Sequence, residues 1–144
     1  MTVEAPMEPP PPTRMHVGLN VDDLDEATGF YTKMFGRPPT LRRDGYVKWM
    51  LDDPHVNFSI TASSDEPVGV NHLGLQVDDS GELERQRRAW DDADLDRHDQ
   101  NDLVCGYQLQ DKSWVFDPVG VPWEVFLTRG VVDEYGTDEM PDTR

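Results

Sequence analysis

The sequence predicts an α+β fold built from two copies of one strand-helix-strand-strand-strand module, at about residues 14–62 and 69–130. One observation is a repeat: the phrase HVGLNVDD at residues 16–23 returns as HLGLQVDD at residues 72–79, with six of eight positions identical. The other is that apolar and polar residues alternate in both copies, as in a strand, and that residues typical of a helix N-terminus follow directly. Two such modules packed about a local twofold axis would bring their first strands together, with a cleft between the modules.

In the first module, the initial strand places His16 on the face opposite its apolar residues, which are Met15, Val17, Leu19 and Val21. Asp23 and Glu26 form an acidic variant of the capping box that opens a helix. Gly36 ends this helix, whose core stripe is predicted to contain Leu24, Ala27, Phe30, Tyr31, Met34 and Phe35. Three strands should follow, near residues 38–43, 46–51 and 55–61.

The second module begins near Val70, and Asp79 opens its helix, which should run to about Ala93. Glu84 and Arg88 are spaced as an i,i+4 ion pair on this helix. Three further strands are predicted near residues 95–100, 106–116 and 122–128. In the last of them Glu124 and Phe126 share one face, and the other face carries Trp123, Val125 and Leu127.

The two ends of the chain carry no periodic pattern. Residues 1–13 contain four consecutive prolines and are predicted to form a disordered arm. Residues 131–144 are predicted to be a loose acidic tail. The folded domain is therefore expected at about residues 14–130.

Composition excludes several kinds of partner. A net charge of −16 argues against nucleic acid, because binding phosphates requires basic patches. No apolar run approaches the roughly 20 residues that cross a bilayer, so no membrane contact is expected. A single cysteine excludes an internal disulfide framework and fits a reducing cytoplasm, which is the predicted location.

The repeated histidine predicts a metal site. If each helix covers the apolar face of its half-sheet, then His16, His72 and Glu124 project into the cleft. Two imidazoles and one carboxylate form a set that suits Fe(II), Mn(II), Co(II), Ni(II) or Zn(II) and leaves positions open for substrate. A single strand histidine is more often just a half-exposed side chain, but two at equivalent repeat positions are harder to ascribe to chance. In the first module, Asn57 aligns with Glu124 by its apolar neighbours. Because an asparagine is a weak metal ligand, we expect three protein ligands rather than four.

Cys105 is the second reactive group. A lone cysteine is more often a small buried apolar residue than a nucleophile. Lys112 is near it in sequence and would lower the pKa of the thiol if the two side chains met.

These residues resemble the vicinal oxygen chelate superfamily, which includes glyoxalase I, extradiol ring-cleaving dioxygenases and bleomycin-binding proteins. The strings CGYQLQDKSWVFDP at residues 105–118 and WEVF at 123–126 are similar to the organoarsenical carbon–arsenic lyases and the cadmium-induced proteins. The resemblance covers about residues 14–130. It implies that the two βαβββ modules form an open, cleft-like mixed β-barrel.

The resemblance also implies roles for individual residues. Fe(II) would be held by His16, His72 and Glu124, and the enzyme would be a metal-dependent dioxygenase or lyase that cleaves carbon–arsenic bonds. Cys105, Tyr107 and Lys112 would act in catalysis, with Lys112 on a gating loop. Cys105, Asn57 and Tyr107 would contact the small-molecule substrate.

One departure from the lyases concerns arsenic capture. Their vicinal cysteine pair reads Cys105-Gly106 here, so the second thiol is missing. A glyoxalase-like or thiol-transfer lyase therefore stays open as an alternative, as does a non-enzymatic protein that sequesters a drug or heavy metal. Superfamily members often dimerise, so the resemblance also admits a homodimer.

Overall fold

The computed structural model describes residues 13–136, without the side chains of residues 106–107 and 131–136. Most of the predicted N-terminal arm, residues 1–12, and residues 137–144 of the predicted tail lie outside this part. The elements are β1 (Arg14–Asn20), α1 (Leu24–Phe35), β2 (Leu41–Arg43), β3 (Tyr46–Asp52), β4 (His55–Thr61), β5 (Gly69–Val77), α2 (Ser80–Asp92), β6 (His98–Phe116) and β7 (Pro122–Gly136).

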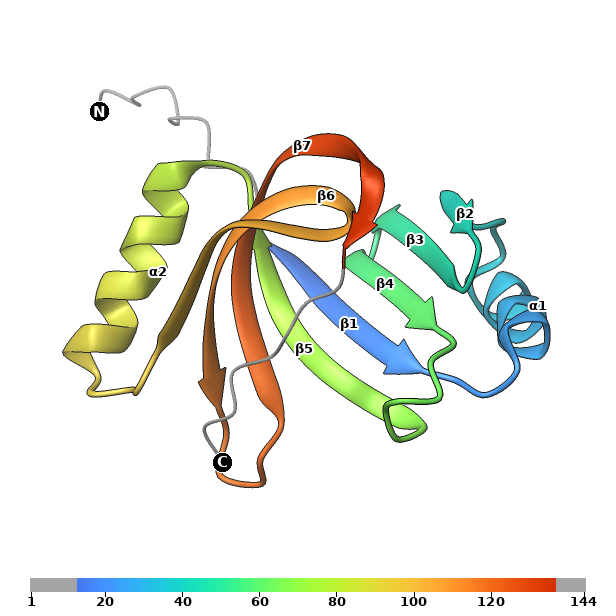
Figure 1. Ribbon diagram of the computed structural model, residues 1–144, viewed down its shortest axis with the longest axis horizontal. Helices are drawn as coiled ribbons and strands as arrows, with labels where there is room; N and C mark the ends of the chain where they lie inside the picture. Colours follow the sequence, from blue (N-terminus) through green and yellow to red (C-terminus); the bar gives the residue numbers. More distant parts are fainter. Residues whose placement is uncertain (1–12, 137–144) are drawn as a thin grey trace, which may run out of the picture.

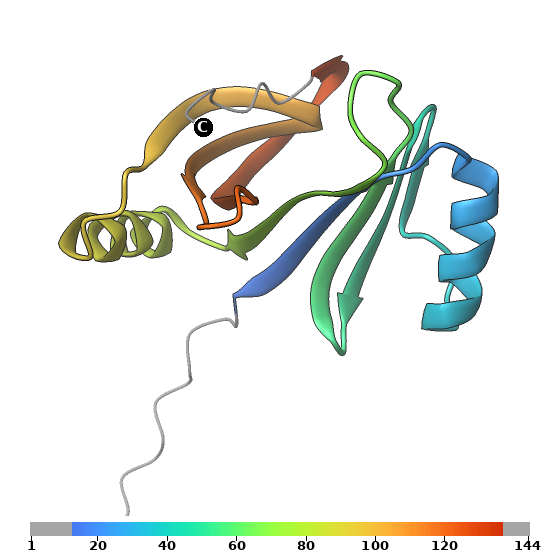
Figure 2. The same ribbon diagram turned by 90° about the horizontal axis from the view of Figure 1, so that it is seen from below.

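All strands of the described residues belong to one mixed sheet, in the order β2-β3-β4-β1-β5-β7-β6. The two modules meet where β1 pairs antiparallel with β5, and within each module the first strand pairs parallel with the last. Figure 1 shows α1 and α2 at opposite ends of this sheet, and Figure 2 shows the sheet curving between them. The predicted α+β fold of two modules in an open sheet is confirmed.

The second module differs from the prediction in its strands. The two strands expected near 95–100 and 106–116 form a single strand, β6, of 19 residues. β7 continues to Gly136, so residues 131–136 extend a strand instead of forming the start of a loose tail. The physical reason is mutual pairing, because the register of β6 with β7 runs from Phe116 and Pro122 out to Gly106 and Gly136.

Both helices begin where the sequence indicated. The Asp23 carboxylate accepts a hydrogen bond from the Glu26 amide at 3.0 Å, and Asp79 accepts one from the Glu82 amide at 2.8 Å. Gly36 ends α1 in the left-handed conformation, with φ of 69°. Of the described helices, neither is long and apolar enough to cross a membrane.

The core of the first module lies between α1 and the sheet. Its aromatic side chains are Tyr31 and Phe35 from the helix with Trp49 and Phe58 from the strands, and Tyr31 lies 4.6 Å from Phe58 between ring centroids. The predicted helix stripe was too wide, however. Phe30 and Met34 are 59% and 55% exposed, because they lie beyond the edge of the face that α1 presents to the sheet.

Strand alternation follows the prediction in both modules. Val17 and Leu19 pack in the core beneath α1, and Leu75, Val125 and Leu127 pack in the core beneath α2. Because side chains alternate along a strand, the residues between them face away from the helices. These residues form the second face of the sheet, which carries the candidate site.

Candidate metal centre

The register of β1 and β5 brings the two repeated histidines together. His16 lies opposite Gly74, and Gly18 lies opposite His72. Each imidazole therefore stands next to a residue without a side chain, and the two Nε2 atoms approach to 2.9 Å. The antiparallel pairing of the two repeated strands thus brings equivalent histidines of the two modules into contact, as the repeat predicted.

The repeated glycines make this approach sterically feasible. A Cβ atom on Gly18 would lie 2.6 Å from Cε1 of His72, and one on Gly74 would lie 2.8 Å from Cγ of Glu124. Real Cβ atoms essentially never make contacts this short. Any larger residue would displace His72 or Glu124, so the His-x-Gly spacing shared by the two copies is part of the site.

Glu124 completes a group of three candidate ligands. It lies on β7 opposite Gly74, and its Oε1 atom is 3.6 Å from Nε2 of His16 and 3.6 Å from Nε2 of His72. The three ligand atoms all lie within 4.8 Å of one another. The structure thus brings together all three residues that the sequence suggested as metal ligands.

Hydrogen bonds on the far side of each ring fix which nitrogen faces the site. Nδ1 of His16 donates to the backbone carbonyl oxygen of Asn57 at 3.0 Å, and Nδ1 of His72 donates to Oδ1 of Asn71 at 2.8 Å. Both Nε2 atoms then carry lone pairs, and these face each other at 2.9 Å. With both Nε2 atoms unprotonated, this arrangement suits a cation bound by both rings, and two imidazoles with a carboxylate suit a divalent metal.

Burial and neighbouring charges set the protonation of this group. Burial is the main cause that lowers the pKa of His16 to about 4, and His72 and Lys112 add to it against the opposing Glu124 carboxylate. Burial alone would raise the pKa of Glu124, but Lys112 and the two histidines outweigh it and lower that pKa. At neutral pH His16 is therefore neutral and Glu124 ionised, as metal ligands must be.

Lys112 holds the other oxygen of Glu124. Its side chain is fully buried, and Nζ lies 2.9 Å from Oε2 of Glu124. The ammonium also lies over the rings of Trp114 and Phe126, at 5.4 and 5.6 Å from their centroids. The location implied by the resemblance was wrong, because Lys112 lies within β6 and not on a gating loop.

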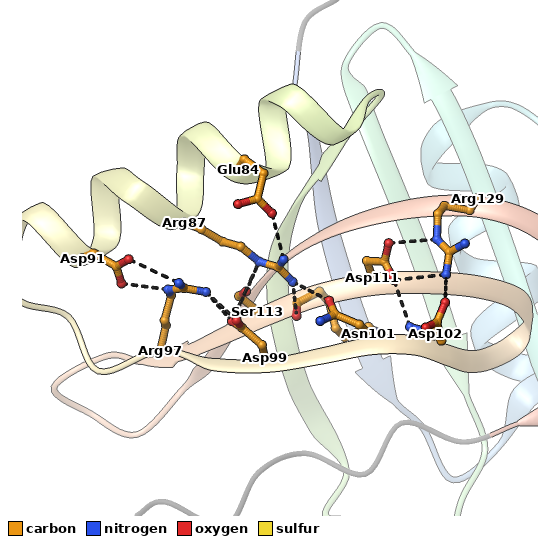
Figure 3. A network of polar contacts seen from close by, with 11 residues as sticks. Glu84, Arg87, Asp91, Arg97, Asp99, Asn101, Asp102, Asp111, Ser113 and Arg129 are labelled. Carbon is orange, nitrogen blue, oxygen red and sulfur yellow. Dashed lines mark hydrogen bonds and ion pairs between the residues drawn. The ribbon is translucent and has the colours of Figure 1, made fainter.

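A network on the α2 side of the sheet fixes this part of β6. The buried Arg87 donates from Nε to Ser113 Oγ at 2.7 Å and from Nη2 to the carbonyl oxygen of Lys112 at 3.1 Å. Figure 3 shows Arg87 reaching from α2 onto β6, where it also meets Asn101. Glu84 pairs with Arg87 at 3.0 Å instead of with Arg88, because Arg87 is the residue that points toward the sheet.

Asn57 is adjacent to the site, but it is not the counterpart of Glu124. Gly74 is opposite Glu124, whereas Gly18, its partner in the repeat, is opposite Ser59. The predicted alignment of Asn57 with Glu124 was therefore wrong by two residues along the strand, and Ser59 is the residue that corresponds to Glu124. Asn57 donates from Nδ2 to Oε1 of Gln76 at 3.0 Å, and its buried Oδ1 has no hydrogen-bond partner among the described residues.

The remaining predicted residues lie on β6. Cys105 is half-buried. Burial lowers the pKa of Lys48, a buried residue of β3 that was not among the predicted site residues, and Cys105 opposes this change. The side chain of Tyr107 lies outside the described residues. Lys48 had a sequence signal, because it falls between the apolar residues Val47 and Trp49 and so belongs to the site face.

Comparison with known proteins identifies the family. A profile of the Glyoxalase/Bleomycin resistance protein/Dioxygenase superfamily matches residues 14–125. A trivalent organoarsenical cleaving enzyme of Bacillus sp. (strain MD1) is 38% identical over 125 residues, which are 85% of this chain and 77% of that protein. The cadmium-induced protein CadI of Mycobacterium tuberculosis (strain ATCC 25618 / H37Rv) is 30% identical over 125 residues, covering 87% and 82%.

A solved structure supports the fold. An extradiol ring-cleaving dioxygenase from B. fuscum superposes with a TM-score of 0.60 at 19% identity, over 92% of this chain and 37% of that one. This likeness concerns the fold alone. The family profile and the sequence relatives show that the chain belongs to the glyoxalase, bleomycin resistance protein and dioxygenase superfamily, and its similarity to the organoarsenical-cleaving and cadmium-induced proteins agrees with the predicted subfamily.

Proposed function

We propose that this chain is a metal-dependent dioxygenase or lyase that cleaves the carbon–arsenic bond of trivalent organoarsenicals, with Fe(II) held by His16, His72 and Glu124. The observation that carries the metal site is the pair of facing Nε2 lone pairs at 2.9 Å beside the Glu124 carboxylate. The arsenical substrate is supported by the similarity to proteins named as organoarsenical cleaving enzymes. When bound, the metal supplies the oxygen chemistry.

The side chains around the three ligands hold them in position. Lys112 binds Oε2 of Glu124, which leaves Oε1 turned toward the histidines. Asn71 and the carbonyl of Asn57 accept from the Nδ1 atoms and keep both Nε2 atoms directed inward. Lys112 is thus a positioning residue in this proposal, because it acts on the metal through Glu124.

Cys105 would hold the arsenic. Its thiolate attacks the trivalent arsenic, an arsenic–sulfur bond forms, and one arsenic–oxygen bond breaks to release hydroxide, which takes a proton and leaves as water. Because the chain has one cysteine, it supplies one such bond. Tyr107 and Asn57 are the further residues proposed to contact the substrate.

The first experiment is an anaerobic titration with Fe(II), followed by oxygen uptake with and without phenylarsonous acid. The proposal predicts one Fe(II) per chain and arsenical-dependent oxygen uptake. His72→Ala should abolish the tight Fe(II) binding, whereas His98→Ala, which removes an imidazole paired with Asp96 instead, should retain it. Cys105→Ser should keep Fe(II) binding and lose the arsenical dependence.

The outcomes separate the alternatives. Fe(II) binding without oxygen uptake would refute the arsenical substrate and favour a glyoxalase-like or thiol-transfer reaction. The glyoxalase-like reaction is the less favoured of these two, because Ser59, the counterpart of Glu124 in the first module, cannot supply a second carboxylate ligand. An absence of metal binding would refute the enzyme and leave a sequestering protein as the best explanation.

A further inference from the structure

Asn57 carries a buried amide oxygen that lacks a hydrogen-bond donor. The residue is 4% exposed, and its Oδ1 atom has no partner among the residues that the structure describes. Within the same part of the chain, Oε1 of Gln110 is the other buried side-chain atom without a partner, but Gln110 lies opposite Thr128, four residues along β7 from Glu124. Burying an acceptor without a donor is costly, so the position of Asn57 favours a ligand that brings one.

Asn57 lies directly beside a candidate metal ligand. It is paired with His16 in the register of β1 and β4, so the two side chains project from the same face of the sheet. The carbonyl oxygen of Asn57 accepts the hydrogen bond from Nδ1 of His16 at 3.0 Å. The residue therefore orients one candidate ligand with its backbone and presents an unused acceptor on its side chain next to that ligand.

Gln76 determines which end of the Asn57 amide remains unused. Nδ2 of Asn57 donates to Oε1 of Gln76 at 3.0 Å. The two residues lie on β4 and β5, which flank β1, so their side chains meet over the strand that carries His16. Because Nδ2 is already engaged, the group that Asn57 offers to a ligand is an acceptor.

The charges around this oxygen favour a neutral donor. Glu124 is ionised, since Lys112 and the two histidines lower its pKa, and its Oε1 atom lies 3.6 Å from Nε2 of His16. An oxyanion that approached Oδ1 of Asn57 would be repelled by the amide oxygen and by the nearby carboxylate. A hydroxyl group can instead donate its proton to Oδ1 while it stays uncharged.

We propose that Asn57 is a specificity-determining residue whose Oδ1 atom accepts a hydrogen bond from a neutral hydroxyl group of the ligand that binds beside His16. The identity of this ligand rests on the proposed function: it is a trivalent organoarsenical, and a hydroxyl group on arsenic is the donor. The contact favours a hydroxyl over a methyl group of similar size, because a methyl group would leave the buried oxygen without a donor.

The test compares two arsenicals that differ by one hydroxyl group. Methylarsonous acid carries two hydroxyl groups on arsenic, and dimethylarsinous acid has a methyl group in place of one of them. With either probe, the Cys105 thiolate forms an arsenic–sulfur bond, one arsenic–oxygen bond breaks, and the released hydroxide takes a proton and leaves as water. One hydroxyl group then remains on arsenic in the first adduct and none in the second.

The readout is the hydroxyl preference, defined as the dissociation constant of dimethylarsinous acid divided by that of methylarsonous acid. The protein has one cysteine, so titration of its free thiol gives both constants. The titrations are anaerobic and contain EDTA, so neither metal nor oxygen takes part. N-acetylcysteine gives the reference preference of a thiol without a binding site.

We expect a native preference about tenfold above the reference, because a buried acceptor gains its donor. Asn57→Leu should reduce the preference to the reference value. The matched control is Gln86→Leu, which removes a half-buried amide from α2 and should leave the preference unchanged. A native preference no higher than the reference would overturn the proposal without any variant, and so would an unchanged preference in Asn57→Leu.

Thermal unfolding in EDTA separates this role from a structural one. Asn57→Leu loses the hydrogen bond to Gln76, but it also removes an oxygen that lacks a donor. Its Tm should therefore stay within about 3 °C of that of the native protein. A larger decrease would assign Asn57 to the stability of the fold, with a buried water as the donor to its oxygen, and would overturn the proposal.

The contact and the proposed reaction can fail separately. A preference that depends on Asn57, together with absent oxygen uptake, would keep the hydroxyl contact and discard carbon–arsenic cleavage. Arsenical-dependent oxygen uptake with a native preference equal to the reference would do the reverse.

Discussion

The ion pair between Lys112 and Glu124 provides the sharpest test of how the site is held together. Both side chains are almost wholly removed from water, at 0% and 3% exposure, and their atoms meet at 2.9 Å. Replacing Lys112 by Met keeps most of the side-chain volume but leaves a buried carboxylate without its cation. Breaking a buried pair in this way costs about 3–5 kcal/mol.

The assay is thermal unfolding at pH 7 in EDTA. For a chain of this size, each kcal/mol lost from the free energy of unfolding lowers Tm by about 3 °C. The Tm of Lys112→Met should therefore be lower than that of the native protein by about 10 °C or more. Lys112→Met/Glu124→Gln should recover much of this loss, because a neutral amide needs no counter-charge. Added Mn(II) should also narrow the gap between Lys112→Met and the native protein, since a divalent cation replaces the missing positive charge.

The matched control is Lys33→Met, which removes a lysine from the exposed side of α1. If Lys112→Met unfolds at the same temperature as this control in EDTA, the carboxylate does not depend on Lys112. The account of Glu124 as an ionised group oriented by that lysine would then be wrong.

Two further predictions follow from the same site. Gly18→Ala should weaken Mn(II) binding, measured by calorimetry, at least about tenfold without unfolding the protein, because the added Cβ would lie 2.6 Å from the His72 ring. The control Gly29→Ala, whose added Cβ meets nothing within 4 Å, should bind Mn(II) as the native protein does. Equal Mn(II) affinities of the two variants would refute the steric argument. Burial lowers the pKa of His16 to about 4 in the folded protein. Between pH 6.5 and 4, the unfolded chain therefore binds a proton at His16 that the folded protein does not bind. Stability in EDTA should therefore fall with decreasing pH across this window, by up to about 1.4 kcal/mol per unit in urea titrations, and His16→Asn should lack this component; an identical pH profile for the two proteins would contradict it.

Strand alternation predicted which face each site residue occupies, but not its position along the strand. His16, His72 and Glu124 were placed on one side by parity alone. Asn57 and Ser59 have the same parity, so only the pairing of β1 with β4 reveals that Ser59 is the counterpart of Glu124. The error was therefore a displacement along the correct face.

Tertiary partners account for what the local sequence did not reveal. The strand predicted at 106–116 contains Lys112, but the burial of this lysine depends on Glu124 and on the rings of Trp114 and Phe126, which only the tertiary structure brings to it. Phe30 has helical core spacing but lies beyond the width of the sheet that α1 covers.

The division of the candidate ligands between the modules has a consequence for cooperativity. His16 belongs to the first module, whereas His72 and Glu124 belong to the second, and among the described strands only the β1–β5 pairing joins the two half-sheets. Opening of either module would take the donor set apart, so any free energy of metal binding is shared by both halves. Bound metal should therefore slow amide hydrogen exchange beneath α1 and beneath α2 together, turning two adjoining units into one that unfolds as a whole.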